Sequence, residues 1–235
     1  MKLAKSIGRL GTETAFEVLA KAKKLEAQGK DIVHLEIGEP DFETPDHIKE
    51  AAKKALDDNF THYVPSPGLM EVREVIAEHQ SAVHNKNISP ENVVFTPGAK
   101  PIMFFTIMAL IEPGDEVIYP NPGFPIYESM INYVGGKAVP MELKEEKGFN
   151  ADVDLIEQSI TDKTKLIILN SPNNPCGSVM EPSDIKKVAD IAKEKDIVMS
   201  LGPAGTGKSF LAVSVGVTML MEKKIERVIL SRPAV

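Results

Sequence analysis

The sequence contains very little cysteine: Cys176 is the one cysteine among 235 residues. A single thiol cannot form a disulfide within the chain, so a reducing compartment is the default expectation. Residues 1–5, MKLAK, contain no apolar stretch of the kind that a secretory signal peptide requires. We therefore expect a cytoplasmic protein.

The sequence also lacks a long hydrophobic run and an excess of basic residues. Its longest apolar run, residues 101–111, is too short to span a bilayer and is typical of a buried helix. The 27 basic residues are outnumbered by 34 acidic ones, and the net charge of −7 disfavours a broad nucleic-acid surface. The composition therefore favours neither a membrane protein nor a nucleic-acid-binding protein.

What the chain does contain is an alternation of helices and strands, in an ordinary globular composition of 43% hydrophobic and 26% charged residues. Apolar periodicity predicts helices over residues 13–29, 44–56, 69–84, 101–111, 126–134, 153–160 and 182–194. Short apolar runs predict strands over residues 32–35, 93–95, 116–119, 137–141, 165–169 and 197–199. This order predicts an α/β fold with a mainly parallel sheet that is covered on both faces.

The stretch from Asn170 to Gly177 stands out, because it follows the apolar run 166–169 and contains two prolines. The prolines end the strand and stiffen its exit, so that Asn173 and Asn174 lie on a rigid loop. The carboxyl ends of parallel strands are where α/β sheets bind ligands, and a carboxamide there offers a donor and an acceptor to a planar polar ring. A simple turn is the alternative interpretation of Asn-Asn-Pro.

Two more loops follow predicted strands. Gly98, Ala99 and Lys100 begin a helix, and small residues there expose backbone N–H groups that can bind an anion. Phe124 lies between two prolines on another loop, where an aromatic ring can stack on a flat ligand. A plain strand-to-helix turn and ordinary packing are the respective alternatives. Together the three loops predict a site for a planar ring that carries a phosphate.

Residues 1–200 resemble the N-terminal part of the fold-type I, class I/II aminotransferases, which use pyridoxal 5′-phosphate (PLP). The stretches that carry the resemblance are Gly38-Glu39-Pro40-Asp41-Phe42, Thr61-His62-Tyr63, Pro97-Gly98-Ala99-Lys100, Pro113-Gly114-Asp115-Glu116-Val117, Asn121-Pro122-Gly123-Phe124 and Ser171-Pro172-Asn173-Asn174-Pro175-Cys176-Gly177. The resemblance implies the large domain of an aspartate aminotransferase-like fold, and transfer of an amino group between an amino acid and a 2-oxo acid.

The resemblance also implies a role for each matching residue. Asn174 should hydrogen-bond the phenolic oxygen of PLP, Phe124 should stack on its ring, and the backbone of Gly98, Ala99 and Lys100 should hold its phosphate. Tyr63 should reach the phosphate of a neighbouring subunit's cofactor, since these enzymes are homodimers, and Gly38 should lie beside the substrate carboxylate. Cys176 stands where the family usually has threonine.

The resemblance stops after Ser200. The family continues there with Asp-Glu-x-Tyr, whose aspartate makes the cofactor ring an electron sink, and later with Ser-x-Ser-Lys, whose lysine forms the Schiff base. This sequence contains neither motif. Lys100 and Lys208 are the lysines considered as replacements, and neither is expected to point at the cofactor's aldehyde carbon. We therefore expect the chain as written to be inactive as an aminotransferase.

A different motif begins at Gly202. The run Gly202-Pro203-Ala204-Gly205-Thr206-Gly207-Lys208-Ser209 fits the P-loop pattern G-x-x-x-x-G-K-S. In a P-loop the glycine-rich backbone surrounds phosphates, the lysine reaches the outer phosphates and the serine hydroxyl binds Mg²⁺, so Mg-ATP is a second candidate ligand. Residues 202–235 resemble the start of the PhoH-like P-loop ATPases. A glycine loop without a nucleotide is the alternative interpretation.

The two resemblances predict three parts: an arm or small-domain segment over residues 1–45, an incomplete PLP-binding domain over 46–200, and a P-loop βαβ fragment over 201–235. Their abrupt meeting near residue 200 suggests a chimeric reading frame or a fusion. Three hypotheses follow for the chain: a PLP-dependent aminotransferase, an ATP-binding protein, and a chimeric fragment without function.

Overall fold

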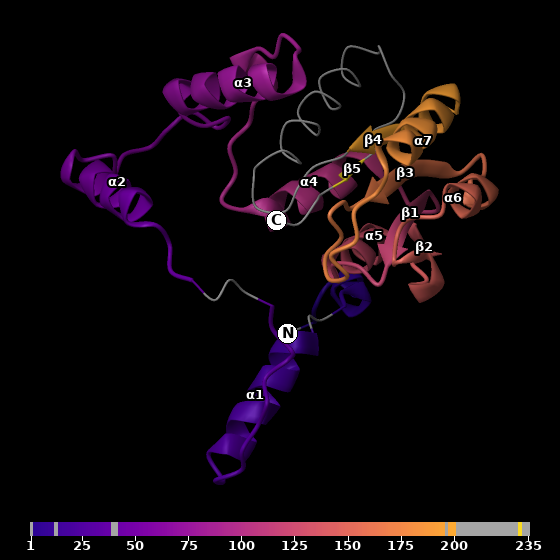
Figure 1. Cartoon of the computed structure of the whole chain (residues 1–235), viewed down its shortest axis with the longest axis horizontal. Helices are drawn as coiled ribbons and strands as arrows, with labels where there is room; N and C mark the ends of the chain where they lie inside the picture. Colours follow the sequence, from indigo (N-terminus) through magenta and orange to yellow (C-terminus); the bar gives the residue numbers. More distant parts are fainter. Residues whose placement is uncertain (1, 12–13, 39–41, 196, 201–229, 232–235) are drawn as a thin grey trace. The chain divides into compact units, whose positions relative to one another are not determined.

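The computed structural model describes residues 2–11, 14–38, 42–195, 197–200 and 230–231. The predicted P-loop, from Gly202 to Ser209, lies outside these residues. The chain divides into two compact units, one formed by residues 1–11 and 66–235 and the other by residues 12–65 (Figure 1). The first unit contains the sheet.

The sheet of the first unit is entirely parallel, as predicted. Its strands are β1 (Glu116–Asn121), β2 (Lys137–Glu142), β3 (Thr164–Leu169), β4 (Val198–Ser200) and β5 (Leu230–Ser231). Four of them follow the order β2-β1-β3-β4, and β5 pairs with β3 at Ile168 and Leu169. Because all ladders are parallel, the carboxyl ends of β1, β2 and β3 meet at one edge of the sheet.

Helices cover both faces of this sheet (Figure 1). These are α4 (Ala99–Leu110), α5 (Ile126–Val134), α6 (Val153–Ser159) and α7 (Pro182–Glu194). In β3, Ile167 and Leu169 join the core that includes residues of α6 and α7. Leu166 and Ile168 join the opposite core, which includes residues of α4 and α5. Successive side chains of a strand point to opposite faces, so a strand buried on both faces carries apolar residues on both, as β3 does from Leu166 to Leu169.

The N-terminal segment packs on α5. The short 3₁₀ helix η1 (Lys5–Arg9) ends with Arg9, whose Nη2 donates to the carbonyl oxygen of Tyr133 at 2.7 Å. Two residues later the Gly11 N–H donates to Ser129 Oγ at 3.0 Å. A guanidinium at the last carbonyls of a helix is favourable because it satisfies an acceptor and complements the helix dipole.

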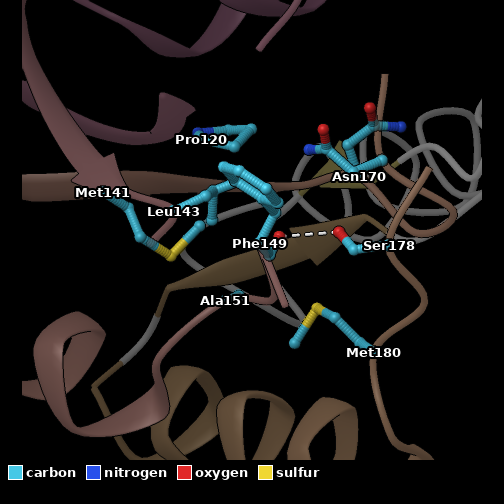
Figure 2. A pocket seen from close by; sticks show the side chains of 9 residues that line it. Pro120, Met141, Leu143, Phe149, Ala151, Asn170, Ser178 and Met180 are labelled. Carbon is cyan, nitrogen blue, oxygen red and sulfur yellow. Dashed lines mark hydrogen bonds between the residues drawn. The ribbon is translucent and has the colours of Figure 1, made fainter. Parts of the chain in front are cut away.

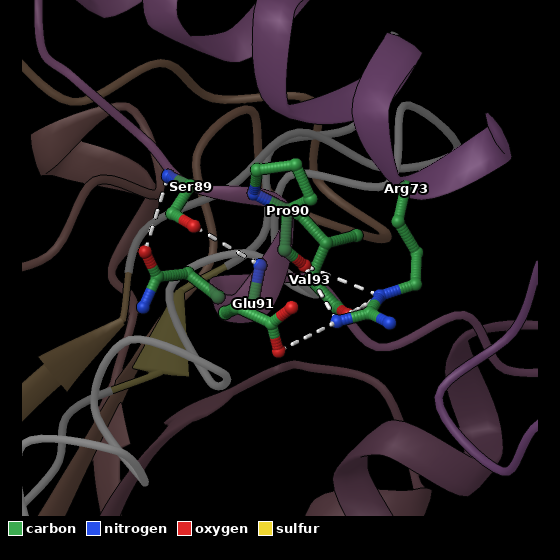
Figure 3. Close-up of polar contacts among 6 residues, drawn as sticks. Arg73, Ser89, Pro90, Glu91 and Val93 are labelled. Atoms are coloured by element: carbon green, nitrogen blue, oxygen red, sulfur yellow. Dashed lines mark hydrogen bonds and ion pairs between the residues drawn. The ribbon is translucent and has the colours of Figure 1, made fainter. Parts of the chain in front are cut away.

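Arg73 connects α3 (Met70–His84) to the segment that precedes α4 (Figure 3). Its side chain is buried, and Nε donates to the carbonyl oxygen of Val93 at 2.8 Å. Nη2 donates to the carbonyl oxygen of Pro90, also at 2.8 Å, in the 3₁₀ helix η2 (Pro90–Asn92), which Ser89 caps. The guanidinium thereby satisfies two carbonyl groups that have no place in a ladder.

The second unit contains α1 (Thr14–Glu26), α2 (Asp46–Asp57) and a connecting segment between them. In that segment His34 lies between two carboxylates, with 2.7 Å to Glu36 and 2.8 Å to Glu26. The hydrogen bond with Glu36, and to a smaller extent that with Glu26, raises the pKa of His34. The histidine thus ties the end of α1 to the chain that follows it.

Two predicted strands are wrong: neither residues 32–35 nor residues 93–95 form a strand. Val33 and Leu35 are exposed, at 81% and 88%, and no described strand pairs with them. An apolar run becomes a strand only when another strand supplies hydrogen-bond partners, and the sequence pattern does not reveal such a partner. The seven predicted helices are all present, with ends shifted by a few residues. None of the described helices is long and apolar enough to cross a membrane.

Candidate ligand site at the carboxyl edge of the sheet

The loop after β3 is fastened by hydrogen bonds within itself. The Asn173 N–H donates to the Ser178 carbonyl at 2.8 Å, and the Asn173 carbonyl accepts from the Gly177 N–H at 2.8 Å. Asn173 Oδ1 accepts from the Cys176 N–H at 3.1 Å. The bonds around Asn173 explain why it is 2% exposed. The two asparagines considered as ligand contacts therefore differ in availability, because the backbone and the side-chain oxygen of Asn173 are already hydrogen-bonded within the loop.

Asn174 is half-buried, and its side-chain amide has no hydrogen-bond partner among the described residues. Its backbone N–H, by contrast, is held by Asn170 Oδ1 at 2.5 Å. The peptide bonds before Pro172 and Pro175, on either side of Asn174, are both cis. A fixed backbone with an uncommitted carboxamide leaves Asn174 able to recognise a polar group of a ligand.

A small pocket lies behind this loop (Figure 2). Residues from the ends of β1, β2 and β3 and from two loops line it: Pro120, Met141, Leu143, Phe149, Ala151, Asn170, Asn173, Ser178 and Met180. Ser178 Oγ donates to the Phe149 carbonyl at 2.6 Å and joins the loop after β3 to the segment before α6. We had not predicted Phe149 or Ser178 here, because their contact joins residues 29 positions apart.

The N-terminus of α4 has the geometry expected of an anion site. Gly98 is the N-cap residue and has a φ of 96°, which glycine adopts without strain. Ala99 and Lys100 occupy the first turn of α4, the part of a helix whose N–H groups point toward a bound anion. Pro101 follows them and contributes no N–H, so the first turn offers one donor fewer than an ordinary helix.

Lys100 and Phe124, which are 24 positions apart in the sequence, meet at this site. Lys100 Nζ lies 5.7 Å from the centroid of the Phe124 ring, within the range of a cation–π contact. The other ring neighbour is Tyr127, edge-on at 6.1 Å between centroids. Phe124 is half-buried on the loop after β1. The ring is thus supported on its edge and close to a cation that can also face a phosphate.

Two titratable groups near these loops are held protonated. Burial raises the pKa of the Cys176 thiol. Burial, followed by the carboxylate of Glu128, raises the pKa of Tyr119 at the end of β1 to about 12. Neither group therefore supplies a base near neutral pH. Among the described residues, no cluster of three or more histidine, cysteine, aspartate or glutamate side chains has the arrangement of a metal site.

Gly98, Ala99, Lys100, Phe124 and Asn174 all belong to the first unit, where Lys100 contacts Phe124. Gly38 and Tyr63 belong to the second unit, where both are exposed. The candidate nucleotide-binding residues Gly202, Gly205, Thr206, Gly207, Lys208 and Ser209 lie outside the described residues.

The first unit is thus a parallel α/β sheet with helices on both faces, and its polar loop after β3 lies at the carboxyl edge, where such sheets bind ligands. The family described as aminotransferase class I and II matches residues 30–200. A probable aspartate/prephenate aminotransferase of Aquifex aeolicus is 40% identical over 195 residues, which are 83% of this chain and 50% of that protein. The chain belongs to the class I and II aminotransferases.

Further relatives agree with this assignment. A probable aspartate aminotransferase of Methanocaldococcus jannaschii is 44% identical over 169 residues, 72% of this chain and 44% of that protein. The solved aspartate aminotransferase of Thermus thermophilus with maleate has a TM-score of 0.80 at 37% identity, and covers 84% of this chain and 52% of that one. The chain spans about half the length of the relatives it matches.

A second family, described as PhoH-like protein, matches residues 181–235. The two matches overlap over residues 181–200, which contain α7 and β4. A helix followed by a parallel strand is a unit that both matches share.

Proposed function

We propose that the first unit is the PLP-binding part of an aminotransferase. The observation that carries the proposal is the uncommitted Asn174 carboxamide on a fastened loop at the carboxyl end of β3, in the unit that also holds Phe124 and the start of α4. Asn174 would bind the phenolic oxygen, Phe124 would stack on the ring, and the backbone of Gly98, Ala99 and Lys100 would hold the phosphate. When bound, PLP supplies an electron sink for the bond changes of amino-group transfer.

The substrates we propose are an amino acid and a 2-oxo acid. Relatives in the family are named aspartate aminotransferases, and one is named an aspartate/prephenate aminotransferase. Gly38 would lie beside the substrate carboxylate, and Tyr63 would reach the phosphate in a second copy of the chain in a homodimer. Turnover is not expected of this sequence as written, because it contains no Asp-Glu-x-Tyr and no Ser-x-Ser-Lys motif.

The experiment that tests the proposal is calorimetric titration of the purified chain with pyridoxamine 5′-phosphate. This probe has no aldehyde, so its binding does not depend on the missing lysine. We expect saturable binding that Asn174→Ala weakens by about tenfold, the usual effect of losing one hydrogen bond to a charged or strongly polar group. Asn132→Ala, near the far end of α5, is the matched control. Absence of binding, or equal affinity in both variants, contradicts the proposal.

A second candidate function is Mg-ATP binding through Gly202–Ser209. The match of the PhoH-like family to residues 181–235 and the sequence of the motif support it. In this proposal Lys208 would reach the outer phosphates, and Ser209 would bind Mg²⁺. Titration with Mg-ATP should show binding that Lys208→Ala abolishes, while pyridoxamine 5′-phosphate binding is unchanged.

We also propose that the three parts predicted from the sequence, residues 1–45, 46–200 and 201–235, come from two families joined in one chain. The overlap of the two matches at residues 181–200 supports this proposal. A single sequencing read of the source DNA across the codons for Met199 to Gly202 tests it. A read that continues from Ser200 into Asp-Glu-x-Tyr contradicts the junction. The cytoplasmic location stays a prediction from the cysteine content.

A further inference from the structure

We propose that Asn170 is a positioning residue that sets the direction of Asn174, an inference that rests on the function proposed above. Asn170 is the first residue after β3 and is 5% exposed. Its Oδ1 accepts the backbone N–H of Asn174 at 2.5 Å. A buried side chain at the end of a core strand therefore holds the backbone of the residue that would contact the cofactor.

The other half of the Asn170 amide fixes which way the side chain faces. Because Oδ1 is engaged by an N–H donor, Nδ2 must point elsewhere. Nδ2 is buried and has no partner among the described residues. Asn170 also lines the pocket of Figure 2, which has room for about one water molecule. A water molecule in this pocket would satisfy Nδ2, so the amide can keep Oδ1 directed at the Asn174 N–H.

Most bonds of the loop do not reach the backbone of Asn174. Those around Asn173 close the loop on itself, through Cys176, Gly177 and Ser178, and Ser178 Oγ also donates to the Phe149 carbonyl. The Asn170 side chain links the end of β3 directly to Asn174, four residues later. Asn170 thus transmits the position of the core strand to the Asn174 carboxamide.

The test compares two probes, pyridoxamine 5′-phosphate and its analogue without the 3-hydroxyl group, by calorimetry. The wild-type chain should prefer the hydroxylated probe by about tenfold, as expected for one strong hydrogen bond. In Asn170→Ala the ratio of the two affinities should fall close to one, because the Asn174 carboxamide is no longer held in its orientation. Asn170→Asp keeps an acceptor for the Asn174 N–H and should retain the preference.

Ser171→Ala is the matched control. Ser171 is also buried, and its Oγ accepts the Met180 N–H at 2.8 Å, so its loss removes an equivalent bond from the same loop without affecting Asn174. It should lower stability and leave the preference unchanged. A preference that survives in Asn170→Ala, or that Ser171→Ala removes equally, overturns the positioning role.

A second measurement uses the chain without any probe, and needs no variant to fold. Amide hydrogen exchange followed by NMR should show the Asn174 N–H protected at least about tenfold relative to an unstructured peptide. Rapid exchange at Asn174 overturns the inference. If the wild-type chain binds neither probe, the proposed function fails, and the exchange measurement still decides whether Asn170 holds Asn174.

Discussion

Gly123, in the loop after β1, has no room for a side chain. A Cβ atom built there would lie 2.1 Å from the carbonyl oxygen of Pro120. Gly123→Ala must therefore displace backbone, and we expect the free energy of unfolding to fall by about 1–3 kcal/mol in urea denaturation. Gly8→Ala is the control, since nothing lies within 4 Å of a Cβ there. Equal effects of the two changes would contradict the close approach.

Pro101 gives a second prediction at the scale of one residue. Pro101→Ala restores a backbone N–H to the first turn of α4, and should tighten pyridoxamine 5′-phosphate binding by about threefold if that turn holds the phosphate. Pro182→Ala makes the same change in the first turn of α7 and should have no effect on affinity. Unchanged affinity in Pro101→Ala would place the phosphate elsewhere.

The sequence predicts the conformation of a site residue where adjacent residues determine it. The glycine before α4 and the prolines around Asn174 act on the backbone next to them, so the loops that contain them could be predicted from the sequence. The approach of Lys100 to Phe124 and the bond from Ser178 to Phe149 are not, because the fold brings those residues together across 24 and 29 positions.

At the scale of elements, Arg73 gives a test of how α3 is held. Arg73→Met keeps most of the apolar stem and removes the donors for the carbonyls of Pro90 and Val93. Leaving the Val93 carbonyl unpaired should lower the free energy of unfolding by about 1–3 kcal/mol, while the Pro90 carbonyl still accepts the Val93 N–H at 3.0 Å. Glu91 lies 3.4 Å from the guanidinium and has an exposed side chain. Glu91→Gln should therefore change the free energy of unfolding by less than about 1 kcal/mol. A thermal or urea unfolding curve for each variant decides between them.

Glu116 at the start of β1 makes the stability of the sheet depend on pH. Its carboxylate accepts from Lys137 Nζ at 2.8 Å and from Thr161 Oγ1 at 2.7 Å, which lowers its pKa from 4.5. The unfolded chain therefore binds this proton more readily, so the stabilisation is present above pH 4.5 and is lost as pH falls through the lower native pKa.

Glu116→Gln should accordingly reduce stability at pH 7 and make the loss of stability below pH 4.5 less steep. Urea denaturation at several pH values measures both effects. Glu71→Gln, an exposed change on α3, should leave the pH profile as it is. A Glu116→Gln profile that runs parallel to that of the wild type would show that the carboxylate is not responsible.

The strands illustrate what sequence patterns predict at this scale. Both faces of β1 and β3 are covered, so continuous apolar runs predicted them correctly. The runs at residues 32–35 and 93–95 are also apolar, but no strand in the described part of the chain pairs with them. The difference between the two cases is made by segments distant in the sequence, which periodicity does not identify.

At the scale of the whole molecule, the two units differ in how much they bury. Among the described residues of 12–65, Ala22 is the only buried hydrophobic side chain, whereas the first unit holds the two cores of the sheet. Amide exchange followed by mass spectrometry should therefore show α1 and α2 exchanging far faster than β1 and β3. Similar protection in both units would contradict this expectation.

The alternation in β3 has a consequence for insertions and deletions during evolution. The side chains on its two faces, Leu166 and Ile168 on one and Ile167 and Leu169 on the other, are all isoleucine or leucine. Removing one of these four residues would move the others to opposite faces and leave three apolar side chains for four core positions. The same deletion would draw Asn170 back by about 3.3 Å and turn it to the other face of the sheet. The length of this strand is therefore constrained by the loop that it carries as well as by the cores that it fills.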